Sequence, residues 1–365
     1  MLSDSSGLLT PASPKSIYRN ALSGSIWNYG ASLKVLVTGG LGFIGSNFVL
    51  RLIKERNGVS VLNLDSVSYG SNPSNLDKLV HESNYRFVRG DISDSEIVRS
   101  TIRGVDAVVN FAAETHVDRS ISSAKSFIGS NIVGVSTLLE ELRRLDRNLS
   151  FVQVGTDEEY GDAQGRSFTE EDTLNPSSPY AASKASASML VAAYVRTYGL
   201  DAKVTRCTNN YGPYQFPEKL IPKSVIRAHL GLKVPVYGDG LNSRDWIHVE
   251  DHCEALELVM RRGKPGSVYN IAGGNELANL DLVKMILKAM KKPESLIEFV
   301  EDRPGHDKRY SLNDEKIRNE LGWKPKHKFE SGLEETIQWY LKNEKWWRPI
   351  ANEKTLSAAP WKLEW

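Results

Sequence analysis

The chain has 365 residues, with 46 Lys and Arg against 45 Asp and Glu, and 40% of its residues are hydrophobic. This length fits one large domain or two modest ones, and a net charge of +1 leaves no broad basic face for nucleic acid. Cys207 and Cys253 lie far apart, which argues against a disulfide scaffold or a cysteine-rich zinc site. No apolar run reaches the roughly 18 to 20 residues that cross a bilayer. We expect a soluble, cytoplasmic protein with no nucleic-acid or membrane partner.

The first 32 residues differ in composition from the rest of the chain. They hold eight Ser, one acidic residue (Asp4) and two basic residues (Lys15 and Arg19), without a periodic apolar stripe. A transit peptide would need more Arg, and a signal peptide would need a longer apolar stretch. We predict a flexible amino-terminal extension over residues 1–32, either an address or a tail on the surface.

From Lys34 onward, apolar runs that predict strands alternate with segments of helical periodicity. This alternation predicts an α/β fold, a Rossmann-type doubly wound parallel sheet whose ligands bind at the carboxyl ends of the strands. The first strand starts at Lys34 and runs into a glycine turn, and the predicted elements that follow are helices at 43–56, 126–144 and 180–198, and strands at 59–64, 85–88, 106–111 and 150–154.

The turn after the first strand has the pattern of a dinucleotide-binding site. Its glycines allow a tight turn and a close approach of pyrophosphate to a helix amino terminus. Asp65 follows twenty positions after Gly45 (65 − 45 = 20), where an acid binds the adenosine ribose and repels a 2′-phosphate, which favours NAD. Residues 91–92 and 112–114 follow the third and fourth predicted strands, where the adenine and the nicotinamide ribose are expected, but ordinary loop residues are an equally good interpretation of each segment. The predicted NAD-binding residues are Gly39, Gly42, Phe43, Ile44, Gly45, Asp65, Asp91, Ile92, Ala112, Ala113, Glu114, Tyr180, Lys184 and Asn210.

Tyr180 and Lys184 form a Y-x-x-x-K pattern at the start of the last predicted helix. The spacing places both side chains on one helix face. A nearby ammonium favours the phenolate, so Lys184 is expected to lower the tyrosine pKa toward that of a useful general base. With the dinucleotide pattern upstream, the pair predicts catalysis rather than a solvated helix face.

At these residues the chain resembles the extended short-chain dehydrogenase/reductase superfamily, from about Lys34 to the carboxyl terminus. After the fifth predicted strand it reads Gly155-Thr156-Asp157-Glu158-Glu159-Tyr160-Gly161, similar to the S-T-D-E-V-Y-G of the dTDP-glucose 4,6-dehydratase family. Gly155 and Glu159 stand where the family has Ser and Val, and we expect these differences to affect local packing more than chemistry. The resemblance implies a catalytic set of Thr156, Asp157, Glu158, Tyr180 and Lys184. Two adjacent carboxylates separate their pKa values, which suits an acid and a base in an elimination.

Further segments resemble the same family, including 112–121, 206–215, 217–222 and 302–307. The implied substrate is dTDP-glucose or a related nucleotide sugar, dehydrated to a 4-keto-6-deoxy sugar by internal hydride transfer through bound NAD. Arg and Lys suit its diphosphate. His116 fits a sugar contact or a packed loop histidine equally well. The implied substrate-binding residues are His116, Thr156, Asn209, Lys219, Leu220, Tyr237, Arg244, Asn270, Arg303 and His306.

Four prolines make the pattern irregular after Tyr211, which predicts a smaller mixed α/β substrate domain. We predict an NAD-binding domain over 33–210, with returns near 246–260 and 268–272, and a mainly substrate-binding domain over 211–365. The Trp-rich carboxyl-terminal segment is expected to pack as core.

Several alternatives stay open. A UDP-glucose 4,6-dehydratase would have the same catalytic set, and a nucleotide-sugar 4-epimerase or decarboxylase would share Tyr180 and Lys184 without needing two carboxylates. A non-enzymatic NAD-sensing protein is disfavoured because no catalytic residue is lost. His248 and His252 lack a third ligand, so no metal is expected, and 249–252 is predicted to start a helix. Relatives dimerise through two helices, here 126–145 and 180–198, which implies a homodimer.

Overall fold

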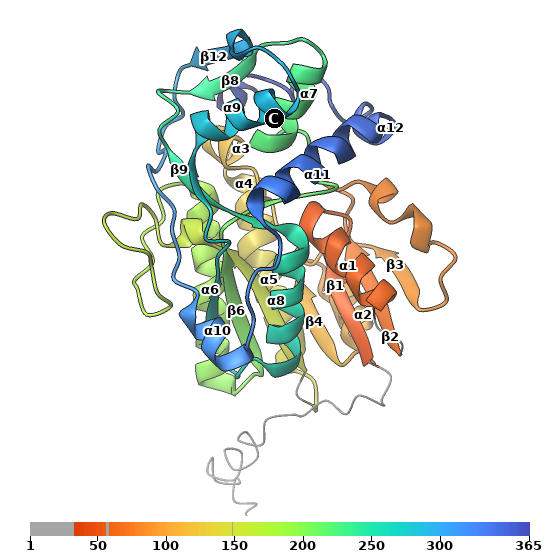
Figure 1. The fold of residues 1–365 in the computed structure, drawn as a ribbon. Coiled ribbons are helices and arrows are strands. Elements are labelled where there is room, and N and C mark those ends of the chain that lie inside the picture. The colour runs from red at the N-terminus through yellow and green to blue at the C-terminus, as the bar shows by residue number, and fades with distance from the viewer. Residues whose placement is uncertain (1–32, 56–57, 148) are drawn as a thin grey trace, which may run out of the picture.

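The computed structural model describes residues 33–55, 58–147 and 149–365, so the predicted extension over 1–32 lies outside the described residues. A large sheet fills the lower half of the molecule in Figure 1. Its seven strands are all parallel, in the order β10-β6-β5-β4-β1-β2-β3. Their bounds are β1 Leu33–Thr38, β2 Val59–Asp65, β3 Tyr85–Arg89, β4 Ala107–Asn110, β5 Ser150–Thr156, β6 Ala202–Cys207 and β10 Val268–Ile271.

This sheet confirms the predicted fold class, and each of the five predicted strands lies within two residues of its expected bounds. The strand order changes direction between β1 and β4, because the chain goes outward from β1 to β3 and then returns to the other side of β1. In such a sheet the loops on either side of the reversal separate and leave a crevice at the carboxyl ends of the strands.

Helices cover both faces of the large sheet, each over its own apolar cluster. On one face lie α1, α8 and α10, and on the other lie α2, α5 and α6. The predicted helix over 126–144 is a continuous helical run whose middle is a π-helix, which the spacing does not predict. The bounds are α1 Phe43–Glu55, α2 Ser95–Ile102, α3 Val117–Ser122, α4 Lys125–Phe127, the π segment Ile128–Gly134, α5 Val135–Arg143, α6 Pro179–Tyr198, α8 Val249–Arg262 and α10 Glu315–Leu321.

The upper part of Figure 1 is built mostly from residues after β6. It has two small sheets, β11-β9-β7 and β12-β8, packed with helices around further apolar clusters. The bounds are β7 Asn209–Tyr211, β8 Val234–Tyr237, β9 Ser243–His248, β11 Glu276–Ala278, β12 Ile297–Val300, α7 Leu220–His229, α9 Asn279–Ala289, α11 Phe329–Lys342 and α12 Glu344–Trp347.

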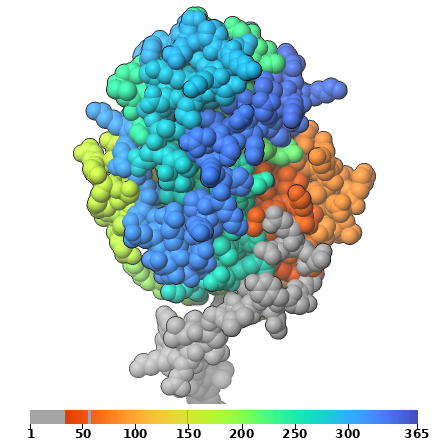
Figure 2. Space-filling view, viewed as in Figure 1, coloured from red at the N-terminus to blue at the C-terminus, as the bar shows by residue number. Residues whose placement is uncertain are grey.

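The carboxyl-terminal third takes part in both regions. In Figure 2 its blue residues occupy the upper part of the visible face and also its lower left, where α10 packs against β10 and α8. Trp347 and Trp361 are buried, with 2% and 8% of their surface exposed, which confirms that tryptophans of this segment serve as core. Within the described residues, none of the helices combines the length and the apolar character that membrane crossing requires.

Candidate active site

A cavity opens at the carboxyl ends of the strands in the large sheet and extends toward β7 and the start of α7. It brings together all five predicted catalytic residues. It also brings together every predicted cofactor residue except Glu114, and three of the predicted substrate residues. The predicted residues that line it are Gly39, Gly42, Phe43, Ile44, Gly45, Asp65, Asp91, Ile92, Ala112, Ala113, Thr156, Asp157, Glu158, Tyr180, Lys184, Asn209, Asn210 and Lys219.

The glycine turn between β1 and α1 forms one end of this cavity. A side chain at Gly45 would place its Cβ only 2.3 Å from the carbonyl oxygen of Gly39, so the helix can approach the turn only with glycine there. The amino terminus of α1, at Phe43, also lines the cavity. Backbone N–H groups at a helix start favour a phosphate, so this end fits a dinucleotide pyrophosphate.

Asp65, the last residue of β2, is held in place by its neighbours. Its Oδ2 accepts from the backbone N–H of Leu41 at 2.9 Å, and its Oδ1 accepts from Val67 N at 2.7 Å and Ser71 Oγ at 3.0 Å. A carboxylate has about four acceptor positions, so Asp65 can still accept from a ligand hydroxyl. The arrangement fits a ribose at this end of the cavity.

The catalytic turn leaves the end of β5 as the 3-10 segment Asp157–Glu159 (η5). Thr156 caps this turn, and its hydroxyl donates to Asp157 Oδ1 at 3.1 Å. Asp157 is 3% exposed, and its Oδ2 has no hydrogen-bond partner among the described residues. A buried acceptor without a partner is costly, which indicates that a ligand group belongs there.

The pKa values of the two neighbouring carboxyls are raised. Burial, and then the charge of Glu158, raises the pKa of Asp157 well above its ordinary value. Burial also raises the pKa of Glu158, but the charges of Arg303, Lys219 and Arg244 oppose the increase. The stronger effect on Asp157 favours a protonated Asp157 beside an ionised Glu158, as the sequence predicts for an acid and base pair.

Helix α6 places Tyr180 and Lys184 at the cavity. Ser178 caps the helix, accepting from Ala181 N at 3.1 Å, and Pro179 occupies the first turn, so Tyr180 lies at the helix start. The prediction that Lys184 lowers the tyrosine pKa is wrong for the protein alone, because burial and the charge of Glu158 raise the pKa of Tyr180. The Lys184 ammonium donates to the carbonyl oxygen of Val154 at 2.6 Å, and burial lowers its pKa.

Three predicted substrate residues, Tyr237, Arg303 and His306, lie outside the cavity lining, and two of them contact Asp118. Asp118 accepts from Arg303 Nη1 at 2.8 Å and from the Tyr237 hydroxyl at 3.2 Å, and the ring centroid of His306 is 6.3 Å from that of Tyr237. Arg244 also lies outside the lining, 4.1 Å from the Tyr310 ring centroid, but its charge acts on Asp157 and Glu158. Of these residues, the two arginines lower the pKa of Glu158, and Arg244 also lowers that of Asp157.

Four other predicted residues are also placed outside the cavity lining. Leu220 begins α7. Glu114 pairs with Arg119 at 2.9 Å, and the buried His116 caps α3 and lies 3.2 Å from a Glu218 oxygen, so His116 packs as a loop histidine. Asn270 is completely buried. Its amide is satisfied there, because it accepts from the Tyr160 hydroxyl at 3.0 Å and donates to Phe168 O at 3.1 Å. The side chains of Glu114, His116 and Asn270 thus bond neighbouring protein groups, and Leu220 packs against apolar side chains.

Sequence reasoning missed several residues near the site. The Tyr310 hydroxyl donates to Asp307 at 2.8 Å and lies 3.5 Å from Glu158 Oε2. The Tyr69 hydroxyl donates to Glu218 at 2.5 Å, and both residues line the cavity. Asp118 lies inside the 112–121 segment, whose match to the family could have indicated it. Tyr310 and Tyr69 lie outside the matched segments, so no signal marked them.

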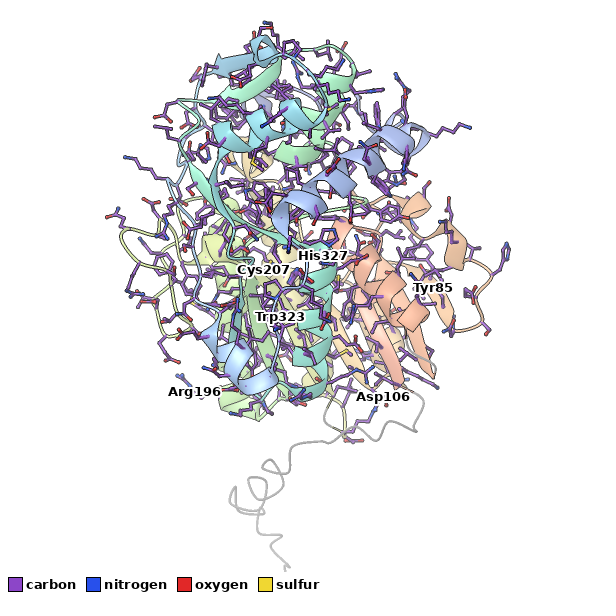
Figure 3. The ribbon with its side chains drawn as sticks, viewed as in Figure 1. Tyr85, Asp106, Arg196, Cys207, Trp323 and His327 are labelled. Atoms are coloured by element: carbon purple, nitrogen blue, oxygen red, sulfur yellow. The ribbon has the colours of Figure 1, made fainter. Side chains whose placement is uncertain are left out.

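The expected start of α8 at Val249 is confirmed, with His248 as its cap. The rings of His248 and His327 are stacked, with centroids 4.0 Å apart, and His327 (Figure 3) lies 3.0 Å from Asp251. His252 is buried against Asn210, at 2.9 Å. One ligand atom each of His248, Glu250 and His327 lie within 4.8 Å of one another, so the fold brings His248 two potential ligands that the spacing of His248 and His252 did not show. That no metal binds stays a prediction.

The fold and the site together define a Rossmann-type enzyme of the short-chain dehydrogenase/reductase class, with two added carboxyls beside the Tyr and Lys pair. The chain belongs to the family described as GDP-mannose 4,6 dehydratase, whose model matches residues 36–336. The dTDP-glucose 4,6-dehydratase of Streptomyces niveus is 48% identical over 332 residues, covering 90% of this chain and 98% of that protein.

Solved structures extend this comparison. The dTDP-glucose 4,6-dehydratase of Streptomyces venezuelae, solved with NAD bound, is 46% identical with a TM-score of 0.85, covering 87% of this chain and 100% of that one. The UDP-glucose 4-epimerase of Thermotoga maritima is 30% identical with a TM-score of 0.79, covering 86% and 100%. The fold is therefore shared with epimerases, and the site must distinguish the reaction.

Proposed function

We propose that this protein is a dTDP-glucose 4,6-dehydratase that uses NAD. One observation supports this most strongly. Asp157 and Glu158 both have raised pKa values and line the same cavity as Tyr180, Lys184 and the glycine turn. An epimerase needs only the tyrosine base, whereas removing water also needs an acid and a second base. The similarity to enzymes with that activity agrees with the site.

NAD would be held by the glycine turn, the start of α1 and Asp65, and it supplies the hydride acceptor at C4 and the hydride donor at C6. The close approach of the helix to the turn at Gly45, where a Cβ would clash, and the free acceptor position on Asp65 both fit such a ligand. The carboxylate of Asp65 would repel a 2′-phosphate, which supports NAD over NADP.

The first step assigned to the chain is proton removal from the glucose 4-hydroxyl. The Tyr180 phenolate takes this proton, and the ammonium of Lys184 stabilises the negative charge. Thr156 Oγ1, which donates to Asp157 in the protein alone, would donate to the forming C4 carbonyl. Since Tyr180 begins with a raised pKa, this step depends on positive charge near the phenol.

The second step removes water across C5 and C6. The new 4-ketone acidifies the C5 proton, which the ionised Glu158 removes, and the protonated Asp157 donates to the departing C6 hydroxyl. The pKa of Asp157, raised well above its ordinary value, supports its role as the acid. Its unpartnered Oδ2 is the position from which it would reach the C6 oxygen.

The diphosphate would bind beside these carboxyls. Lys219 lines the cavity and donates to Thr115 O at 2.9 Å. The positive charges of Arg244 and Arg303 lower the pKa of Glu158, and both side chains are largely buried. These cations give a dianionic ligand its counter-charges. Asn209, which also lines the cavity, is the proposed polar contact to the sugar.

A homodimer is part of the proposal. Ile128 and Val133 lie on the helical run that ends in α5, and Met189 and Tyr198 lie on α6. All four are about half exposed, at 51%, 49%, 57% and 48%. Neighbouring exposed apolar side chains on two helices suit a partner surface, and these are the two helices expected from the sequence to pair. The cytoplasmic location stays a prediction.

A parallel assay tests the proposed function. Purified protein is incubated with dTDP-glucose, UDP-glucose, GDP-mannose or UDP-glucuronate, and the products are analysed by mass spectrometry. We expect loss of one water from dTDP-glucose with the highest kcat/KM and no accumulation of NADH. A product with unchanged mass would indicate an epimerase, released carbon dioxide from a glucuronate substrate would indicate a decarboxylase, and preference for UDP-glucose would overturn the choice of base.

A further inference from the structure

Glu159 is a completely buried carboxylate directly after the two catalytic carboxyls. Its Oε1 accepts from the backbone N–H of Thr156 at 3.2 Å. Its Oε2 accepts from Arg206 Nε and from Ser188 Oγ, both at 2.7 Å. One side chain with 0% exposure thus joins the catalytic turn to β6 and to α6, the helix that carries Tyr180 and Lys184.

Gly155 provides the space for this carboxylate. A Cβ at Gly155 would lie 2.5 Å from Glu159 Oε1 and 2.6 Å from the carbonyl oxygen of Thr205, distances that side chains do not adopt. These are the two positions where the sequence departs from the S-T-D-E-V-Y-G pattern. The glycine at 155 therefore leaves room for the glutamate at 159 as well as for the Thr205 carbonyl group, and the two departures lie next to each other in the fold.

Arg206, the ionic partner of Glu159, makes a second side-chain hydrogen bond and a ring contact. Arg206 is buried, donates Nη1 to the Tyr160 hydroxyl at 2.8 Å, and lies 4.7 Å from the Tyr160 ring centroid. A buried charge that loses its partner is strongly destabilising, whereas a fully bonded pair holds one geometry. Arg206 and Glu159 therefore hold the turn rigidly against the sheet.

The charge of Glu159 also acts on Lys184, the partner of the Tyr180 base. Burial lowers the pKa of Lys184, and the titratable groups that oppose this are Glu159 from η5 and Cys207 from β6. Cys207, near the centre of the molecule in Figure 3, is buried with its pKa raised to about 12, so it is a neutral thiol near pH 7. The charge of Glu159 thus opposes the effect of burial on the pKa of Lys184, and the same charge also raises the pKa of Tyr180.

We propose that Glu159 is a positioning residue for the dehydration: through Thr156 N, Arg206 and Ser188 it fixes the turn bearing Asp157 and Glu158. The inference rests on the proposed function. It adds to the catalytic set a residue that touches none of the reacting atoms and that the family pattern does not contain.

The test compares Glu159→Gln with the wild type on dTDP-glucose, measuring kcat, KM and the pH profile of kcat. Glutamine keeps the size and one acceptor but removes the charge. We expect kcat to fall about 10- to 100-fold with KM changed less than about twofold, as for a misplaced catalytic group. The alkaline limb should move to lower pH, because the variant lacks a charge that raises the pKa of Lys184.

Glu257→Gln is the matched control, since Glu257 is also buried and pairs with two arginines, Arg51 and Arg261, on the α1 and α8 side of the sheet. It should leave kcat and the pH profile unchanged. An active wild type with an unchanged Glu159→Gln variant, or equal effects of the two substitutions, would overturn the inference. A wild type that dehydrates none of the sugar nucleotides would instead overturn the proposed function.

Gly155→Ala decides the question if Glu159→Gln does not fold. Its new Cβ would clash with Glu159 Oε1 and also with the carbonyl oxygen of Thr205, so the Glu159 carboxylate and the neighbouring strand must both shift while the charge of Glu159 stays in place. We expect a lower kcat with unchanged KM and with a smaller shift of the alkaline limb than loss of the charge would produce. Wild-type kcat in a folded Gly155→Ala variant would contradict the role of Glu159.

Discussion

The two ends of the cavity handle ligand charge differently. At the glycine turn the ligand would meet backbone N–H groups and one carboxylate, Asp65, which is fixed by three protein donors. At the other end, around η5, the ligand would meet carboxyls with raised pKa values, with Arg244 and Arg303 beside them. The glycine turn, which we call the shape-selective end, would recognise its ligand by close backbone contact. The region around η5, which we call the charged end, would recognise its ligand through carboxyls and the arginines that balance their charge.

This difference predicts which property a mutation at each end should change. A change at the glycine turn should alter cofactor binding with little dependence on pH, because the donors there are uncharged backbone groups. A change among the carboxyls and cations should move pH profiles, because each charge there sets the pKa of its neighbours. The near-neutral net charge of the chain is consistent with both, since the charges that matter are local.

The largest effect is expected at the charged end. An Asp157→Asn, Glu158→Gln double variant removes both the acid and the base of the elimination. We expect water loss to fall by about 10³-fold or more, the range for paired acid and base catalysis, while NAD stays bound. The measurement is product mass against time together with the NAD content of the purified protein. Near wild-type dehydration would show that these carboxyls are not the catalysts.

The next effect tests the shape-selective end. Gly45→Ala places a Cβ 2.3 Å from Gly39 O, which forces the turn and α1 apart. We expect NAD affinity to fall about 10- to 100-fold, because pyrophosphate binding at a helix start depends on close backbone approach, and the pH profile to stay unchanged. Titration of the apoprotein with NAD measures this. Gly129→Ala is the control, since its Cβ would meet nothing within 4 Å, and equal losses would refute the argument.

A smaller effect is expected when one of the cations at the charged end is removed. Arg303 is the first of the cations that oppose the raised pKa of Glu158. In Arg303→Gln, loss of that positive charge raises the pKa of Glu158 further, so the acid limb of kcat should move to higher pH. The measurement is the pH profile of kcat at saturating substrate, with Arg309→Gln as control because Arg309 pairs with Glu276 at a half-exposed position. A limb that stays fixed in both variants would contradict the assignment of Glu158 as the base.

The smallest effect lies outside the cavity and concerns stability. Hydrogen bonds to Asp251 and Glu250 raise the pKa of His327 to about 10. Because the folded pKa exceeds that of the unfolded chain, this stabilisation is complete below about pH 6.5 and is lost as the pH rises toward 10. His327→Ala should therefore lower the free energy of unfolding more at pH 6 than at pH 10, with kcat unchanged. Urea denaturation at both pH values measures it, and equal losses would contradict the ion pair.

The sequence predicted the shape-selective end better than the charged end. Local patterns encode β1, the glycine turn and Asp65, because a strand, a tight turn and a helix start follow one another along the chain. The same holds for Tyr180 and Lys184, which one helix face brings together. In each case the spacing along the chain determines the spatial relation.

The charged end depends on contacts between distant segments, which spacing cannot reveal. Asp118 meets Arg303 across 185 positions, and Tyr310 meets Glu158 across 152. The raised pKa of Tyr180 follows from burial among carboxylates, which the Y-x-x-x-K pattern does not encode. Asn270 seemed available as a ligand in the sequence, but Tyr160 and Phe168 occupy its amide in the fold. The other assigned binding roles remain predictions.

The path of one hydrogen tests the central claim most directly. The protein is incubated with dTDP-glucose labelled with deuterium at C4, and the product is analysed by mass spectrometry and NMR. An intramolecular dehydration through bound NAD predicts a 4-keto-6-deoxy product, lighter by one water, with the deuterium at C6. Deuterium lost to solvent, or retained at C4 in a product of unchanged mass, would contradict the account.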